Sequence, residues 1–202
     1  MRQTRLIMAV FAAALLLFTG CGSPTTANTI NREDDIVTVT LDFTKQSGYA
    51  SNQFAVWIED ANGVFIKTLF VTKFTADGGY EKRPDAIPVW VEQSGIDEGT
   101  KQDAVSGATP KTGAQRYVWD LTDESGARVP DGTYKFFVEG TLRWKNHVLF
   151  SGEIELNGEA ASTDATAEYT YVKSDEQPAL TDKSPENAMI GLVKAEYIPL
   201  KK

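Results

Sequence analysis

The chain has 202 residues, of which 28 are acidic and 20 basic, so its formal net charge is −8. This balance argues against nucleic acid and against an anionic membrane surface as partners, because both require a basic patch. One cysteine cannot form a disulfide within the chain, and one histidine leaves neither a cluster for a transition metal nor a choice of catalytic base for a hydrolase.

Residues 1–20 have the pattern of an export signal. Arg2 and Arg5 precede an apolar run over residues 6–18, which suits a signal-peptide core and is too short to span a bilayer. The run ends in Leu-Phe-Thr-Gly-Cys at 17–21, which resembles the lipobox of bacterial lipoproteins, with Phe18 where Leu is commoner. The alternative is an ordinary signal peptide followed by a chance cysteine.

The lipobox resemblance implies that Cys21 becomes a lipidated N-terminus and anchors the protein in the membrane of the cell envelope, facing the periplasm or the outside. Several acyl chains give stable anchoring where one does not. Loss of residues 1–20 removes two arginines and no acid, which makes the net charge more negative still. Residues 21–35 are polar without periodicity and predict a flexible tether. Residues 36–199 are expected to form a single domain.

Strand patterns begin after the tether. Apolar residues alternate with Thr and Asp over 37–43, the period of a half-buried strand. Two apolar, β-branched and aromatic runs at 54–59 and 64–72 predict two further strands. Between them, Asn62-Gly63 favours a hairpin turn.

Segment 74–113 interrupts this pattern and predicts a long irregular insertion that is rich in glycine. Compact domains rarely keep such insertions without a functional reason. A short helix that carries Val89, Trp90 and Val91 is expected after Pro84-Asp85.

The insertion closes with Asp-Ala-Val-Ser-Gly-Ala-Thr at residues 103–109. Asp103, Ser106, Gly107, Ala108 and Thr109 match a motif that resembles the covalent flavin attachment site of the flavin-carrying subunits of sodium-translocating NADH:quinone reductases. The resemblance implies that a flavin transferase recognises Asp103 and Ser106 and joins the phosphate of FMN to the Thr109 hydroxyl. The alternative is a glycine-containing surface loop between two strands.

An attached FMN would make the protein an electron carrier between redox proteins of the envelope, with the flavin doing the redox chemistry. Its ring would need shelter. Trp90 is a candidate stacking partner, and Tyr80, Lys82 and Arg83 are further candidates in the insertion. The alternative is that Trp90 packs the insertion onto the sheet.

Strand patterns return after the insertion, at residues 115–121, 133–142, 147–156, 167–173 and 189–198. Turns are expected at 123–126 and 129–132, and loops at 157–164 and 180–187. Many short strands with polar turns predict an all-β fold, an antiparallel sandwich.

Residues 117–134 contain Tyr-Val-Trp-Asp-Leu-Thr-Asp, then Gly126, then Val-Pro-Asp-Gly-Thr-Tyr. This stretch resembles the immunoglobulin-like domain of flagellar hook-capping proteins, which implies an immunoglobulin-like sandwich with Trp119 in its core. The layout, including segments 56–60 and 67–70, is similar to a family of uncharacterised periplasmic proteins known only as a domain of unknown function.

Two other functions remain open, a non-enzymatic binding module of the cell envelope and an assembly role in a larger complex. A calcium site made of Asp123, Glu124 and Asp131 is an alternative to solvated turns. We expect no metal site and no hydrolase. For His147, a structural role is expected, at an exposed or hydrogen-bonded position in a strand.

Overall fold

The computed structural model describes residues 35–47, 52–96, 105–143, 146–171 and 189–200. The chain divides into two compact units, and all of these residues belong to the second unit, 31–202. The expected signal peptide, the lipidation site Cys21, nearly all of the tether, Asp103 of the flavin motif and the loop 180–187 therefore lie outside the described residues.

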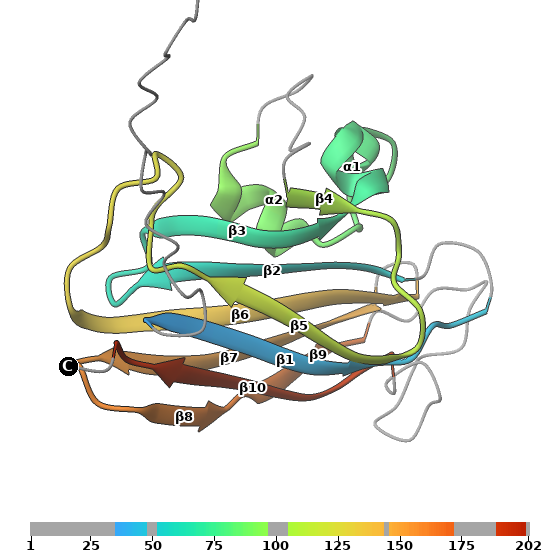
Figure 1. The fold of residues 1–202 in the computed structure, drawn as a ribbon. Helices are drawn as coiled ribbons and strands as arrows, with labels where there is room; N and C mark the ends of the chain where they lie inside the picture. Colours follow the sequence, from blue (N-terminus) through green and yellow to red (C-terminus); the bar gives the residue numbers. More distant parts are fainter. Residues whose placement is uncertain (1–34, 48–51, 97–104, 144–145, 172–188, 201–202) are drawn as a thin grey trace, which may run out of the picture. The chain divides into compact units, whose positions relative to one another are not determined.

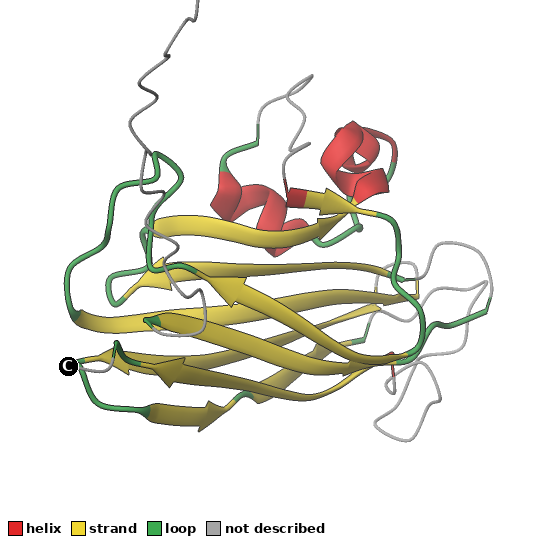
Figure 2. Ribbon diagram, viewed as in Figure 1, coloured by secondary structure: helices red, strands yellow, loops and turns green. Residues whose placement is uncertain are grey.

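The described residues form two β-sheets that pack face to face (Figures 1 and 2). The order of the four-stranded sheet is β5 (Gly113–Trp119), β1 (Ile36–Phe43), β10 (Ile190–Ile198) and β8 (Ala161–Asp164). The order of the six-stranded sheet is β4 (Ser106–Gly107), β3 (Phe65–Thr72), β2 (Gln53–Asp60), β6 (Gly132–Arg143), β7 (Asn146–Leu156) and β9 (Thr166–Thr170). Neighbouring strands are antiparallel except β3 and β4, so the expected antiparallel sandwich is confirmed.

The main core lies between the two sheets and follows the alternation of the sequence. In β1, every second residue from Val37 to Phe43 is buried there, while Asp42 points to solvent. Trp119 is fully buried in this core, as expected, and its indole Nε1 donates to the Thr122 carbonyl at 2.8 Å. Tyr134 packs edge-on against Trp119 and donates to the Pro130 carbonyl at 2.8 Å, a contact similar to the tyrosine corner of immunoglobulin-like sandwiches.

A second core lies on the other face of the six-stranded sheet. Strand β2 is buried on both faces, which explains its nearly continuous apolar sequence. On this second face, three short helical segments of the insertion cover β2 and β3. They are η1 (Thr75–Gly79), α1 (Tyr80–Lys82) and α2 (Pro88–Ser94). Figure 1 shows α1 and α2 beside β3. The buried residues of this second core are Ala55, Trp57, Val71, Ala76, Ile87, Trp90 and Ile96.

Two expectations about local structure need correction. The insertion is not irregular throughout, since its described part contains these short helical segments and strand β4. The segment 157–164 is not wholly a loop, because residues 161–164 form β8 and pair with β10. Strand β8 lies at a sheet edge with two of its four residues exposed, so its sequence shows no apolar alternation. The expected hairpin turn at Asn62-Gly63 and the helix with Trp90 are confirmed.

Among the residues that the structure describes, no helix has the length and apolar character needed to cross a membrane.

Candidate functional site

The described part of the flavin motif lies at the edge of the six-stranded sheet. Ser106 and Gly107 form β4 and pair in parallel with the end of β3. The chain then leaves the sheet, with Ala108 exposed and Thr109 half-buried. Residues 111–114 are exposed. The described part of the motif therefore begins in regular structure and presents its last residues on a surface segment.

Gly107 has a structural reason to be glycine. A Cβ atom at this position would lie 2.7 Å from Cε2 of Phe70, which is closer than real Cβ contacts. The Phe70 ring cannot move freely, because it packs against Phe54 at 4.9 Å and against Tyr117 at 5.0 Å between ring centroids. Both Phe70 and Tyr117 are half-buried, so Gly107 lies against a partly exposed aromatic cluster.

Trp90 lies inside the second core. Its side chain is fully buried and its indole Nε1 donates to the Thr68 hydroxyl at 3.1 Å. The structure thus places Trp90 as a packing residue of the insertion, and a planar ligand has no access to its ring. Tyr80 is half-buried against the same core, Lys82 is exposed and Arg83 is half-buried. Of the proposed stacking and phosphate partners, none is brought next to Thr109 by a described contact.

The most unusual group of the second core is the carboxylate of Glu139, which is fully buried in the middle of β6. It accepts two backbone hydrogen bonds at the start of α2. Oε1 accepts from the Val89 N–H at 3.2 Å, and Oε2 accepts from the Trp90 N–H at 2.8 Å. Glu139 therefore supplies from a strand the cap that no side chain of the helix itself provides.

His147 of β7 lies beside this carboxylate. Its Nδ1 is 3.8 Å from Glu139 Oε1, which is too long for a hydrogen bond. Nδ1 is buried and has no hydrogen-bond partner among the described residues. The strand position expected for His147 is confirmed, but the expectation of an exposed or hydrogen-bonded side chain is not, because Nδ1 is buried beside Glu139 without a hydrogen bond.

Burial perturbs the pKa of both groups. Desolvation raises the pKa of Glu139 to about 7, although the hydrogen bonds from Trp90 and Val89 act in the opposite direction. Desolvation also lowers the pKa of His147, against the attraction of Glu168 and Asp85. Desolvation thus favours the neutral form of each group.

A third contact joins the insertion to β6. The hydroxyl of Thr141 accepts from the Ile87 N–H at 2.9 Å and donates to the Asp85 carbonyl at 3.3 Å. Ile87 is fully buried and adopts a left-handed conformation with φ of 47°, which is costly for a β-branched residue. Glu139 and Thr141 therefore hold the turn and first residues of α2 against the sheet.

Sequence reasoning missed the role of Glu139. Along β6, Phe136 and Val138 point into the main core, and Glu139 has the opposite parity. The strand pattern therefore indicates a solvent-facing side chain for Glu139. The face that it occupies is covered only because the insertion folds over it. A signal was nonetheless present, since Glu139 directly follows Phe136, Phe137 and Val138 at the centre of a long strand.

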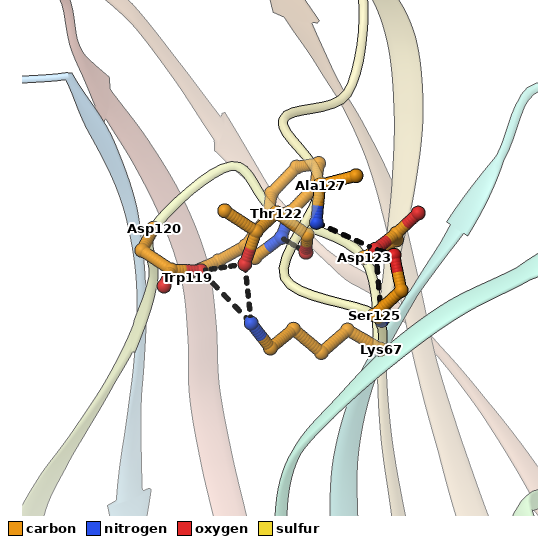
Figure 3. A network of polar contacts seen from close by, with 7 residues as sticks. All are labelled: Lys67, Trp119, Asp120, Thr122, Asp123, Ser125 and Ala127. Carbon is orange, nitrogen blue, oxygen red and sulfur yellow. Dashed lines mark hydrogen bonds and ion pairs between the residues drawn. The ribbon is translucent and has the colours of Figure 1, made fainter.

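The acidic turn after β5 is stabilised by its own side chains (Figure 3). Asp123 Oδ1 accepts from the Ser125 N–H, the Ser125 hydroxyl and the Ala127 N–H. Lys67 Nζ contacts Asp120 Oδ1 at 3.0 Å and bridges β3 to this turn. Among the described residues, no group of three or more His, Cys, Asp or Glu side chains could hold a metal ion. These carboxylates therefore shape the turn.

The two packed sheets define a β-sandwich protein. Residues 35–173 match the family described as "Predicted periplasmic protein (DUF2271)". The match covers more than half of the chain, and the protein belongs to this family of periplasmic proteins of unknown function. The expected resemblance to a periplasmic domain of unknown function is thereby confirmed. No curated protein and no solved structure matches the chain.

Proposed function

We propose that this periplasmic protein is a lipid-anchored electron carrier with FMN attached covalently to Thr109. The observation that supports the proposal is the five-residue motif, whose last residues follow an edge strand on a surface segment. A transferase must reach the acceptor hydroxyl with a slender stretch of backbone in its active site. Gly107 and Ala108 are the smallest residues available for this purpose.

The residues near the motif fit a bound FMN in one respect. The half-buried ring of Phe70 lies next to Gly107 and packs against the half-buried Tyr117. The two rings offer an aromatic surface for an isoalloxazine, which Trp90 does not. When bound, FMN would supply the redox chemistry, and the chain would position it. The partners of such a carrier are a flavin transferase and redox proteins of the cell envelope.

The test is co-expression of the exported chain with a matched flavin transferase, followed by a denaturing gel. Wild type should show in-gel flavin fluorescence, and Thr109→Val should abolish it because the acceptor hydroxyl is lost. Thr112→Val is the matched control, since it removes an exposed hydroxyl of the same segment. Mass spectrometry should find FMN only on the peptide that contains Thr109.

The positive control is a known flavinylated protein expressed in the same cells. If that control fluoresces and the wild-type band does not, the proposal is contradicted. The second candidate would then stand, a non-enzymatic binding or assembly module. That candidate is favoured by Gly107, whose identity the Phe70 contact explains without any flavin.

Anchoring through Cys21 is a separate part of the proposal. It rests on the order of charged, apolar and lipobox residues at the N-terminus. Replacement Cys21→Ser should release the protein from the membrane fraction, because a serine cannot form the thioether to diacylglycerol. A variant that stays membrane-bound and still loses residues 1–20 would show that Cys21 is not the anchor.

A further inference from the structure

The segment that carries Thr109 is fixed to the sandwich on both sides. Before it, Gly107 of β4 pairs with Thr72 of β3. After it, the Thr112 hydroxyl accepts a hydrogen bond from the Lys45 N–H at 3.0 Å, just before β5 begins. Strands β4 and β5 are edge strands of the two sheets, and Figure 1 shows the segment running from one to the other. A group attached to Thr109 therefore starts at this edge of the sandwich.

The rings of Phe70 and Tyr117 lie at the same edge, within reach of such a group. Thr109 is two residues after Gly107, so the Cα atoms of the two residues are at most about 7 Å apart. A Cβ on Gly107 would lie 2.7 Å from the Phe70 ring, and the ring centroids of Phe70 and Tyr117 are 5.0 Å apart. The phosphate and ribityl chain of FMN are long enough to span a gap of this size.

Tyr117 has a hydroxyl that the described part of the fold does not use. The side chain contacts the rings of Phe54 and Phe70, and its hydroxyl makes no hydrogen bond with a described residue. By contrast, the hydroxyls of Tyr134 and Tyr197, which are buried in the same core, both donate hydrogen bonds. Burial raises the pKa of Tyr117, so its phenol stays neutral at neutral pH. A neutral, half-buried ring of this kind is suited to stacking against a planar ligand.

We propose that Tyr117, with Phe70 beside it, is the stacking surface for the isoalloxazine of a Thr109-linked FMN, an inference that rests on the function proposed above. Stacking there covers one face of the flavin ring and leaves the other face for contact with a redox partner. Tyr117 and Phe70 thus take the role that the sequence suggested for Trp90, whose ring is enclosed in the second core.

Flavin fluorescence of the intact, flavinylated protein tests this proposal. A phenol in contact with a flavin quenches its fluorescence, because it donates an electron to the excited flavin and then takes the electron back, with no net reaction. Folded wild type should therefore be dim and should brighten severalfold in denaturant. Folded Tyr117→Phe should already be bright, because phenylalanine keeps the packing but is not an electron donor. Tyr169→Phe is the matched control and should stay dim, since β9 is the opposite edge of the six-stranded sheet.

The outcomes separate this inference from flavin attachment itself. Equal brightness of folded wild type and folded Tyr117→Phe, at equal flavin content, would overturn the stacking role of Tyr117 and leave attachment to Thr109 standing. A wild-type protein without flavin on the denaturing gel would overturn both. If Tyr117→Phe does not fold, the fluorescence anisotropy of wild type decides. A stacked ring tumbles with the whole protein, so an anisotropy as low as that of the denatured protein would overturn the proposal.

Discussion

At Gly107, the nearest obstacle to a side chain is the ring of Phe70, which is itself packed between Phe54 and Tyr117. The glycine of the flavin motif is thus required by packing, whatever a transferase recognises. Ser106 pairs with Val71 in the sheet, while Ala108 and Thr109 lie beyond the last paired residue. Among the described residues of the motif, the flavin proposal therefore rests on these last two.

Replacement Gly107→Ala should lower the free energy of unfolding by about 1–3 kcal/mol, because the new methyl group displaces a packed aromatic ring. Urea denaturation measures the change. Gly191→Ala is the matched control, since a Cβ there meets nothing within 4 Å. Equal effects of the two substitutions would show that the Phe70 contact does not constrain residue 107.

At the scale of elements, α2 shows how a short helix depends on a distant strand. Pro88 at its first position and Gly95 after its last, with φ of 59°, define its ends. Its first amide groups, however, are capped by Glu139 and not by a neighbouring residue. Seven residues are too few for a stable helix in isolation, so the sheet stabilises this helix.

Replacement Thr141→Val should cost about 1–3 kcal/mol, because the buried Ile87 N–H loses its acceptor and cannot reach water. Exchange of the Ile87 amide should become faster than exchange in the main core. Thr133→Val on the same face of β6 serves as control, since Thr133 is exposed. An Ile87 amide that is as protected as in wild type would contradict this account of the attachment.

At the scale of the whole molecule, buried and exposed acids act in opposite directions on stability. Hydrogen bonds, first of all from the Ser125 hydroxyl, lower the pKa of Asp123, so its contribution to stability is present above the ordinary aspartate pKa of 3.8 and is lost in stronger acid. Burial raises the pKa of Glu139, so its contribution is complete below 4.5 and is lost as the pH rises through about 7. The chain therefore keeps one acid whose ionisation at neutral pH destabilises the fold.

Comparison of Glu139→Gln with wild type isolates the contribution of Glu139 to the pH dependence of stability, because the other groups titrate in both proteins. The difference in unfolding free energy, variant minus wild type, should increase by about 3 kcal/mol between pH 4.5 and 7. Denaturant unfolding at a series of pH values measures it. Glu153→Gln controls for the loss of one negative charge. A difference that does not change with pH would mean that Glu139 is hydrated in the folded protein.

The sequence by itself was sufficient to predict most strands, the sandwich, the hairpin at Asn62-Gly63, the helix at Trp90 and the core position of Trp119. These features are local or follow from alternation, because one residue in two must be apolar where a strand covers one core. The flavin motif and the lipobox are also properties of the sequence, and they stay predictions. The structure adds only that the last residues of the motif follow an edge strand.

Apart from the hairpin of β2 and β3, tertiary structure alone decided which strands pair. It also decided where the second core lies and what surrounds Glu139. Strand β8 has no apolar alternation because it is a polar edge, so only its pairing with β10 defines it. Glu139 has the strand parity of a solvent-facing residue, and Trp90 lies in a segment without strand pattern. Both are buried because residues 74–96 fold back over β2, β3 and β6, and burial by a segment about 50 residues away leaves no periodic signal in the sequence.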